Sequence, residues 1–333
     1  MKRVTAYSSF SYLKSFRLYL LAAFAVLVCG FFFGGIAMAQ SNTGSIVGII
    51  TDPQGRAIPG ATVVATDAST GATSKAVTRD DGSYQILNVP IGNYSVQITA
   101  PGFSELRSQA AAVEINHALR IDAKLNVGAV ATTVEVNTST TQVETVSPTV
   151  GGTVTGNPIQ NLPLNGRDTL SLATTQAGVT PTQGTPGASL SFSIAGGRTN
   201  SIAFVLDGGV NNSVMSNAVV SNPNPDDVAE FRILVNNYSA EYGRNGGGVI
   251  TVVTKSGTNE LHGSLFDYLR NDAFNANDFF DKQEGQPRPA LKRNQFGGTF
   301  GGPILKNKVF FFFSYQGQRQ KQALTEPQVT VYT

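Results

Sequence analysis

Residues 231–257 read Phe-Arg-Ile-Leu-Val-Asn-Asn-Tyr-Ser-Ala-Glu-Tyr-Gly-Arg-Asn-Gly-Gly-Gly-Val-Ile-Thr-Val-Val-Thr-Lys-Ser-Gly, the most diagnostic run of the chain. Val249–Thr254 is a Val/Thr-rich run of the length of a buried strand. The glycines Gly246–Gly248 precede a strand instead of opening a helix, and no Gly-x-x-x-x-Gly-Lys-Ser/Thr pattern surrounds them. We therefore interpret them as positions of close backbone approach, and not as a phosphate-binding loop.

The sequence before this stretch predicts a compact α+β region over residues 157–257. Leu170–Thr175 is expected to form a short helix, and Ser201–Leu206 a buried strand that ends in an Asp-Gly turn. Asn224–Phe231 predicts a second short helix, because it has a capping Asn, then a Pro, then acids in the first turn. Both helices belong to the same domain as the strands.

The sequence after this stretch predicts three long strands. They are expected over Leu261–Arg270, Asn294–Gly301 and Lys308–Gln316, with a long polar connection (271–293) followed by a short one (302–307). Long loops alternating with short turns are typical of outer-membrane β-barrels. In the third strand, residues 309, 311, 313 and 315 (Val, Phe, Phe and Tyr) share one face. A strand of a soluble sheet could also be this aromatic.

Three strands cannot enclose a lumen, and an open sheet edge in lipid leaves backbone groups without hydrogen-bond partners. We therefore expect residues 258–333 to be the start of a barrel, and the chain to be the N-terminal part of a longer protein. On its own, such a chain is expected to be unable to transport anything.

Residues 40–127 are rich in short β-type runs separated by turn signals. Tyr94, Val96 and Ile98 alternate with polar residues, as on a half-buried strand, and Asp81-Gly82 is typical of a tight hairpin turn. About seven such strands are expected to pair as a small antiparallel sandwich.

The first 39 residues have the layout of a secretory signal. A basic segment precedes the uncharged run Leu18–Phe33, and Ala37-Met38-Ala39 forms a cleavage site before Gln40. An uncleaved anchor helix is the alternative, because Leu18–Ala39 is long enough to span a bilayer. Removing this segment also removes the single cysteine, Cys29, and four basic residues, and the remaining chain is slightly acidic. This charge balance argues against a nucleic-acid binder.

The 40–127 region resembles the carboxypeptidase-regulatory-like domain. The resemblance rests on Gly48-x-Ile-x-Asp52-x-x-Gly55-x-x-x-Pro59-Gly60-Ala61, on Thr78-x-x-Asp81-Gly82-x-Tyr84 and on Pro90-x-Gly92-x-Tyr94. It does not imply a peptidase, because His117 and His262, the two histidines, are not followed by further metal ligands. We expect no enzymatic activity, no metal and no cofactor.

The 157–257 region is similar to the plug domain of TonB-dependent outer-membrane receptors. The Leu-Asp-Gly turn at 206–208, the Tyr-Gly pair at 242–243, the glycine cluster and the Val/Thr strand occur in the plug's order. The Leu-Pro-Leu-Asn-Gly-Arg run at 162–167, together with the leading sandwich, makes the chain most similar to the Oar-like branch. The resemblance implies TonB and its inner-membrane motor proteins as partners, and uptake of a substrate across the outer membrane.

The linker 128–156 contains a run that resembles the TonB box, the segment that pairs with TonB as an added strand. The run consists of Thr132, Thr133, Val134, Glu135 and Val136. A last strand of the sandwich or a plain linker is the alternative for this run.

From these resemblances we expect a mostly β architecture: a transthyretin-like/Ig-like sandwich, then an α+β plug, then the first strands of a barrel. The sandwich would lie in the periplasm and the barrel in the outer membrane of a Gram-negative bacterium. Candidate contacts of the plug with the barrel wall are Glu230, Arg232, Glu241 and Arg244, although a solvated charge is the alternative for each. A secreted or cell-surface adhesin or glycan-binding β-sandwich protein is the alternative function.

Overall fold

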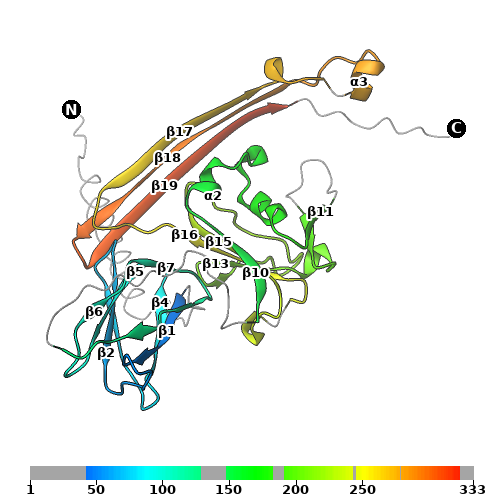
Figure 1. The fold of residues 1–333 in the computed structure, drawn as a ribbon. Coiled ribbons are helices and arrows are strands. Elements are labelled where there is room, and N and C mark those ends of the chain that lie inside the picture. Colours follow the sequence, from blue (N-terminus) through cyan, green and yellow to red (C-terminus); the bar gives the residue numbers. More distant parts are fainter. Residues whose placement is uncertain (1–42, 129–147, 183–190, 243–244, 278, 323–333) are drawn as a thin grey trace, which may run out of the picture. The chain divides into compact units, whose positions relative to one another are not determined.

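A computed structural model describes residues 43–128, 148–182, 191–242, 245–277 and 279–322 (Figure 1). The predicted leader (1–39) and the predicted docking run (132–136) lie outside the described residues, as does Arg244. Within the described ranges, no helix is long and apolar enough to cross a membrane.

The first domain is a sandwich of two sheets around an apolar core. One sheet has the order β4-β1-β8, with β9 also paired to β1, and the other has the order β3-β2-β5-β6, with β7 also paired to β5. The strands are β1 (Thr43–Thr51), β2 (Thr62–Asp67), β3 (Thr73–Val77), β4 (Ser83–Pro90), β5 (Gly92–Thr99), β6 (Leu106–Arg107), β7 (Ala111–Val113), β8 (Ala118–Arg120) and β9 (Ala123–Lys124). Tyr94, Val96 and Ile98 of β5 are buried in the core, as their alternation predicts.

Two expectations for the sandwich are wrong in detail. The sandwich is not wholly antiparallel, because β8 and β9 both pair parallel to β1. Asp81-Gly82 also does not join a hairpin, because β3 and β4 belong to different sheets. The turn instead carries the chain from one sheet to the other, and Gly82 adopts φ 73°, which favours glycine.

Tyr84 of β4 provides a test of the sandwich core. Its hydroxyl donates to the backbone carbonyl of Ile121 at 2.8 Å, and burial raises its pKa. Tyr84→Phe leaves that carbonyl buried without a partner, so we expect the free energy of unfolding to fall by about 1–3 kcal/mol. Chemical denaturation measures this loss. Tyr94→Phe is the matched control, since none of the described hydrogen bonds involves the Tyr94 hydroxyl; an equal loss in both variants would contradict the prediction.

The second domain is built on a five-stranded mixed sheet of order β10-β15-β16-β13-β14. Its strands are β10 (Val150–Thr155), β13 (Ala203–Leu206), β14 (Gly209–Val210), β15 (Val228–Asn236) and β16 (Val249–Thr254). The other elements are the hairpin β11 (Val179–Thr182) and β12 (Ser191–Ile194), the helix α2 (Asn157–Asn161), and the 3-10 helices η1 (Asn165–Arg167), η2 (Thr169–Thr175), η3 (Thr199–Ser201) and η4 (Ala240–Tyr242). Phe231 and Ile233 of β15 face the larger core cluster, and Leu234 faces a smaller one on the opposite side of the sheet.

The helix expected over Asn224–Phe231 does not form. Asn224 does cap a turn, because its side-chain oxygen accepts from the Asp226 backbone N–H at 2.9 Å. The chain then enters β15 at Val228, where β10 and β16 supply a hydrogen-bonding strand on each side. The short helix at the expected position 170–175 is confirmed as η2, whose N-terminus is capped by the Asp168 side chain.

The third part is a sheet of three long antiparallel strands, β17 (His262–Asn271), β18 (Leu291–Leu305) and β19 (Val309–Gln322) (Figure 1). All three expected strands are confirmed, and β18 and β19 extend several residues further than expected. The long connection carries η5 (Asp272–Phe274) and α3 (Phe279–Gln283), whereas the short one is the turn 306–308. Register and alternation give the sheet two distinct faces.

Candidate functional site

Arg167 is positioned by the Leu-Pro-Leu-Asn-Gly-Arg run that precedes η2. Gly166 has φ 72° and Arg167 has φ 57°, so two successive residues adopt the left-handed conformation. Left-handed φ in a non-glycine residue is a strained conformation that the surrounding contacts must hold in place.

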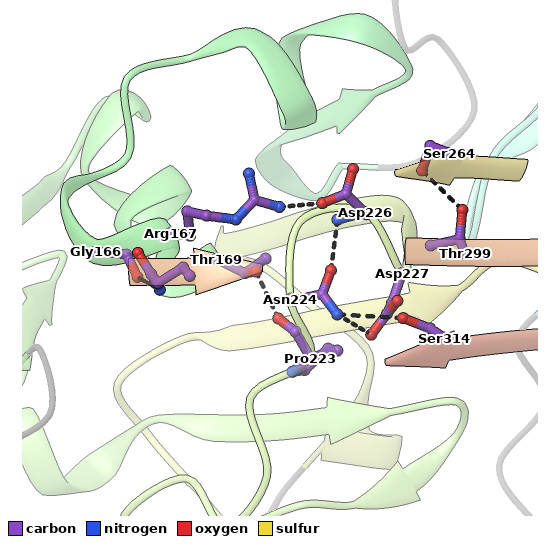
Figure 2. A network of polar contacts seen from close by, with 11 residues as sticks. Gly166, Arg167, Thr169, Pro223, Asn224, Asp226, Asp227, Ser264, Thr299 and Ser314 are labelled. Carbon is purple, nitrogen blue, oxygen red and sulfur yellow. Dashed lines mark hydrogen bonds and ion pairs between the residues drawn. The ribbon is translucent and has the colours of Figure 1, made fainter. Parts of the chain in front are cut away.

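The Arg167 guanidinium lies between an acid of the second domain and two rings of β17. It forms an ion pair with Asp226, and both side chains are about nine-tenths buried (Figure 2). Its central carbon lies 4.5 Å from the ring centroid of Phe266 and 4.3 Å from that of Tyr268. Cation–π contacts at these distances are strongest where the cation has been removed from water, as here.

Hydrogen bonds from all three long strands surround this arginine. Gln295 of β18 donates to the Gly166 carbonyl at 3.0 Å, and Arg270 of β17 donates to the Asn165 side chain at 3.0 Å. Asn224 donates to Ser314 of β19 at 3.3 Å (Figure 2). We call the set Arg167, Asp226, Asn224, Phe266, Tyr268, Gln295 and Ser314 the Arg167 cluster.

The segment that joins the second domain to β17 lies next to the Arg167 cluster and contacts both the second domain and the long strands. The Lys255 backbone N–H donates to the Asp227 carbonyl at 2.6 Å. Burial lowers the pKa of the Lys255 ammonium, and Asp226 and Asp227 oppose that shift. A Cβ on Gly257 would overlap the backbone carbonyls of Gly302 and Phe311, so only glycine permits this approach to β18 and β19.

Glu230 and Arg232 of β15 both bind the backbone of Ile115 in the first domain. The Ile115 N–H donates to Glu230 at 2.9 Å, and Arg232 donates to the Ile115 carbonyl at 2.6 Å. Burial raises the pKa of the Glu230 carboxyl to about 7, while the Ile115 N–H opposes the shift. The Ile115 side chain is itself buried, although it belongs to none of the core clusters.

Glu241, the third predicted contact residue, lies exposed in η4. Its neighbour Tyr242 accepts a hydrogen bond from Asn116 of the first domain at 2.6 Å. The described hydrogen bonds of Glu230 and Arg232 therefore join the second domain to the first. The barrel-wall contact of these residues and of Glu241 stays a prediction.

Sequence reasoning missed the Arg167 cluster. One signal that could have found it is an arginine directly after Asn-Gly, in a region otherwise poor in cations. The second signal is the pair of rings at 266 and 268, which alternation places on one face of a strand. Among the described residues, no group of three His, Cys, Asp or Glu side chains could hold a metal ion.

Two family models match the chain. Residues 45–126 match the carboxypeptidase regulatory-like domain, and residues 253–333 match the outer membrane beta barrel domain. The chain is also 29% identical over 299 residues to the TonB-dependent transporter Oar of Myxococcus xanthus. That alignment covers 87% of this chain and 28% of the relative, so the chain spans little more than a quarter of the relative's length.

Two solved structures show weaker likeness. The siderophore receptor PirA from Acinetobacter baumannii is 21% identical, with 52% of this chain and 24% of that chain covered and a TM-score of 0.39. A type II cohesin–X-dockerin complex from Acetivibrio cellulolyticus is 21% identical, with 27% and 64% covered and a TM-score of 0.22. The two family matches lie in the same order as the sandwich and the long strands of the fold, and the chain is similar to an Oar-type TonB-dependent transporter.

Proposed function

We propose that this chain is the N-terminal portion of a TonB-dependent outer-membrane receptor that takes up a substrate with energy relayed by TonB. The observation that carries the proposal is the Arg167 cluster. It attaches the second domain to one face of three strands whose sequence matches an outer membrane barrel. A plug must be held in this way against the inner wall of its barrel. The comparisons do not favour the adhesin alternative.

In this proposal, TonB pairs with the run Thr132–Val136, which lies between the two domains in sequence. The first described strand after it is β10 (Val150–Thr155), an edge strand that pairs only with β15. Tension on the linker would therefore reach the plug first at the edge of its sheet. Val150, the first residue of β10, is the position nearest to the linker and is paired with Asn236 of β15.

Cysteine crosslinking in cells tests the proposal. The sequence has a single cysteine, Cys29, in the predicted leader, so Val134→Cys introduces a unique thiol into the mature chain. We expect this variant to crosslink to a TonB that carries a cysteine in its strand-pairing region. Val77→Cys is the matched control, because Val77 is 60% exposed on an edge strand of the sandwich. Equal crosslinking of the two variants, or none with Val134→Cys, would contradict the role of TonB.

A further inference from the structure

The three long strands present a second face, opposite to the one that carries the Arg167 cluster. Directly paired positions on this outward face form rows across the sheet. The rows from Val309 to Gly317 are predominantly apolar, with Leu265 92% exposed and Phe313 63% exposed. This length of β19 is about the 9–11 residues that a tilted strand needs to cross a membrane.

Three cations come directly after the apolar rows. Lys292 of β18 is paired in register with Lys321 of β19, and Arg319 lies one row nearer the apolar residues, opposite Asn294. All three side chains are exposed, and none forms an ion pair within the described part of the chain. The closest acid on this face, Asp267, lies on β17, across β18 from Arg319 and one row below it.

Like charges directly opposite each other destabilise an antiparallel pair. A bound anion would offset the repulsion between Lys292 and Lys321 and would also be attracted by Arg319 beside them. Arginine binds phosphate oxygens in a bidentate manner, and lysine contributes a point charge to the same group. These three cations, which we call the cation patch, thus fit a phosphorylated ligand.

The position of the cation patch in the sheet indicates which kind of phosphorylated ligand it would bind. The three cations lie at the end of the sheet that carries the long connection with α3, and the short turn 306–308 lies at the other end. In outer-membrane barrels the long loops are extracellular and the short turns periplasmic. If the proposed function holds, on which this inference rests, the cations lie at the level of the outer-leaflet headgroups.

We infer that Lys292, Arg319 and Lys321 bind the phosphate groups of a phosphorylated lipid in the outer leaflet. The acyl chains of that lipid would lie along the apolar rows below, against residues such as Leu265, Phe296 and Tyr315. A soluble phosphate compound would use only the cations. The continuity of the cations with the apolar rows favours the lipid.

The test uses the full-length receptor that contains this chain, expressed in a Gram-negative host and extracted from the outer-membrane fraction in mild detergent. Mass spectrometry gives the phosphorylated lipid retained per protein, and titration with lipid A gives the affinity. We expect the K292Q/R319Q/K321Q variant to bind lipid A roughly 100-fold more weakly than wild type, since each cation near an anionic surface contributes about fivefold. The matched control K306Q/K308Q removes two exposed lysines at the opposite end of the same strands, and should bind as wild type does.

Three outcomes would overturn the inference. They are equal binding by the triple variant and wild type, equal affinity of wild type for lipid A without its phosphates, and displacement of the lipid by inorganic phosphate at equal concentration. Absence of the wild-type chain from the outer-membrane fraction would overturn both this inference and the proposed function. Presence there without phosphate-dependent binding would overturn the inference alone.

Discussion

Arg167→Ala is expected to release the second domain from the three long strands, at a cost of about 3–5 kcal/mol. The substitution leaves the nine-tenths buried Asp226 carboxylate without its partner and removes both cation–π contacts, with Phe266 and Tyr268. Limited proteolysis in outer membranes measures the effect, because cleavage tracks the population of the opened form. We expect cleavage within residues 157–257 to become more than about 100-fold faster.

Companion variants separate the buried ion pair from a general loss of charge. Arg198→Ala is the matched control, because Arg198 is exposed in the same domain. Arg167→Lys keeps the charge but not the planar guanidinium that stacks on the rings, so an intermediate effect is expected. Adding Asp226→Asn to Arg167→Ala should recover part of the loss, because it removes the unpaired buried charge. Wild-type resistance to proteolysis in Arg167→Ala would contradict the role of the cluster.

Glu230 is expected to make the free energy of unfolding depend on pH between about 4.5 and 7. Burial raises the pKa of this carboxyl from 4.5 to about 7, so within that window the folded state binds a proton that the unfolded state has released. The free energy of unfolding therefore falls as pH rises through the window, by about 3 kcal/mol in total, and is constant above it. Hydrogen exchange at the Ile115 amide, corrected for the intrinsic rate, measures this change.

Glu230→Gln isolates the contribution of the carboxyl. The amide oxygen still accepts from the Ile115 N–H, but the side chain no longer titrates. We expect a flat pH profile between 4.5 and 7 and greater protection than wild type at pH 8. Glu284→Gln, at an exposed site in the long connection, should keep the wild-type profile. A wild-type profile without slope, or the same slope in Glu230→Gln, would refute the assignment.

Much of the fold was predictable because local patterns agree with tertiary packing. The alternation of Tyr94, Val96 and Ile98 matches the buried face of β5, and the alternation that starts at Val309 matches the outward face of β19. The helix expected over 224–231 does not form, because the residue types that favour a helix N-terminus act over only a few neighbouring positions. Asn224 caps a turn equally well, and pairing with β10 and β16 makes the residues from Val228 onward a strand.

The candidate site was less predictable because its residues come from distant parts of the sequence. Arg167, Asp226 and Phe266 meet only after the second domain has packed on β17, and no spacing rule connects them. Glu230 and Arg232 were predicted only as charged candidates for a contact with the barrel wall, and Glu230 was expected in a helix, not in β15. Their described partner, the Ile115 backbone, has no side-chain signal in the sequence.

Crosslinking residue 224 to residue 314 tests whether the second domain is a plug held against the inner face of the barrel strands. The side chains of Asn224 and Ser314 are hydrogen-bonded at 3.3 Å. With cysteines at both positions and a short thiol-specific crosslinker, we expect an internal crosslink in the outer-membrane fraction. Cysteines at Ser264 and Thr299, whose hydroxyls lie 2.8 Å apart on neighbouring strands, serve as the positive control. A crosslink in the control pair with none between 224 and 314 would show that the second domain is not held against these strands.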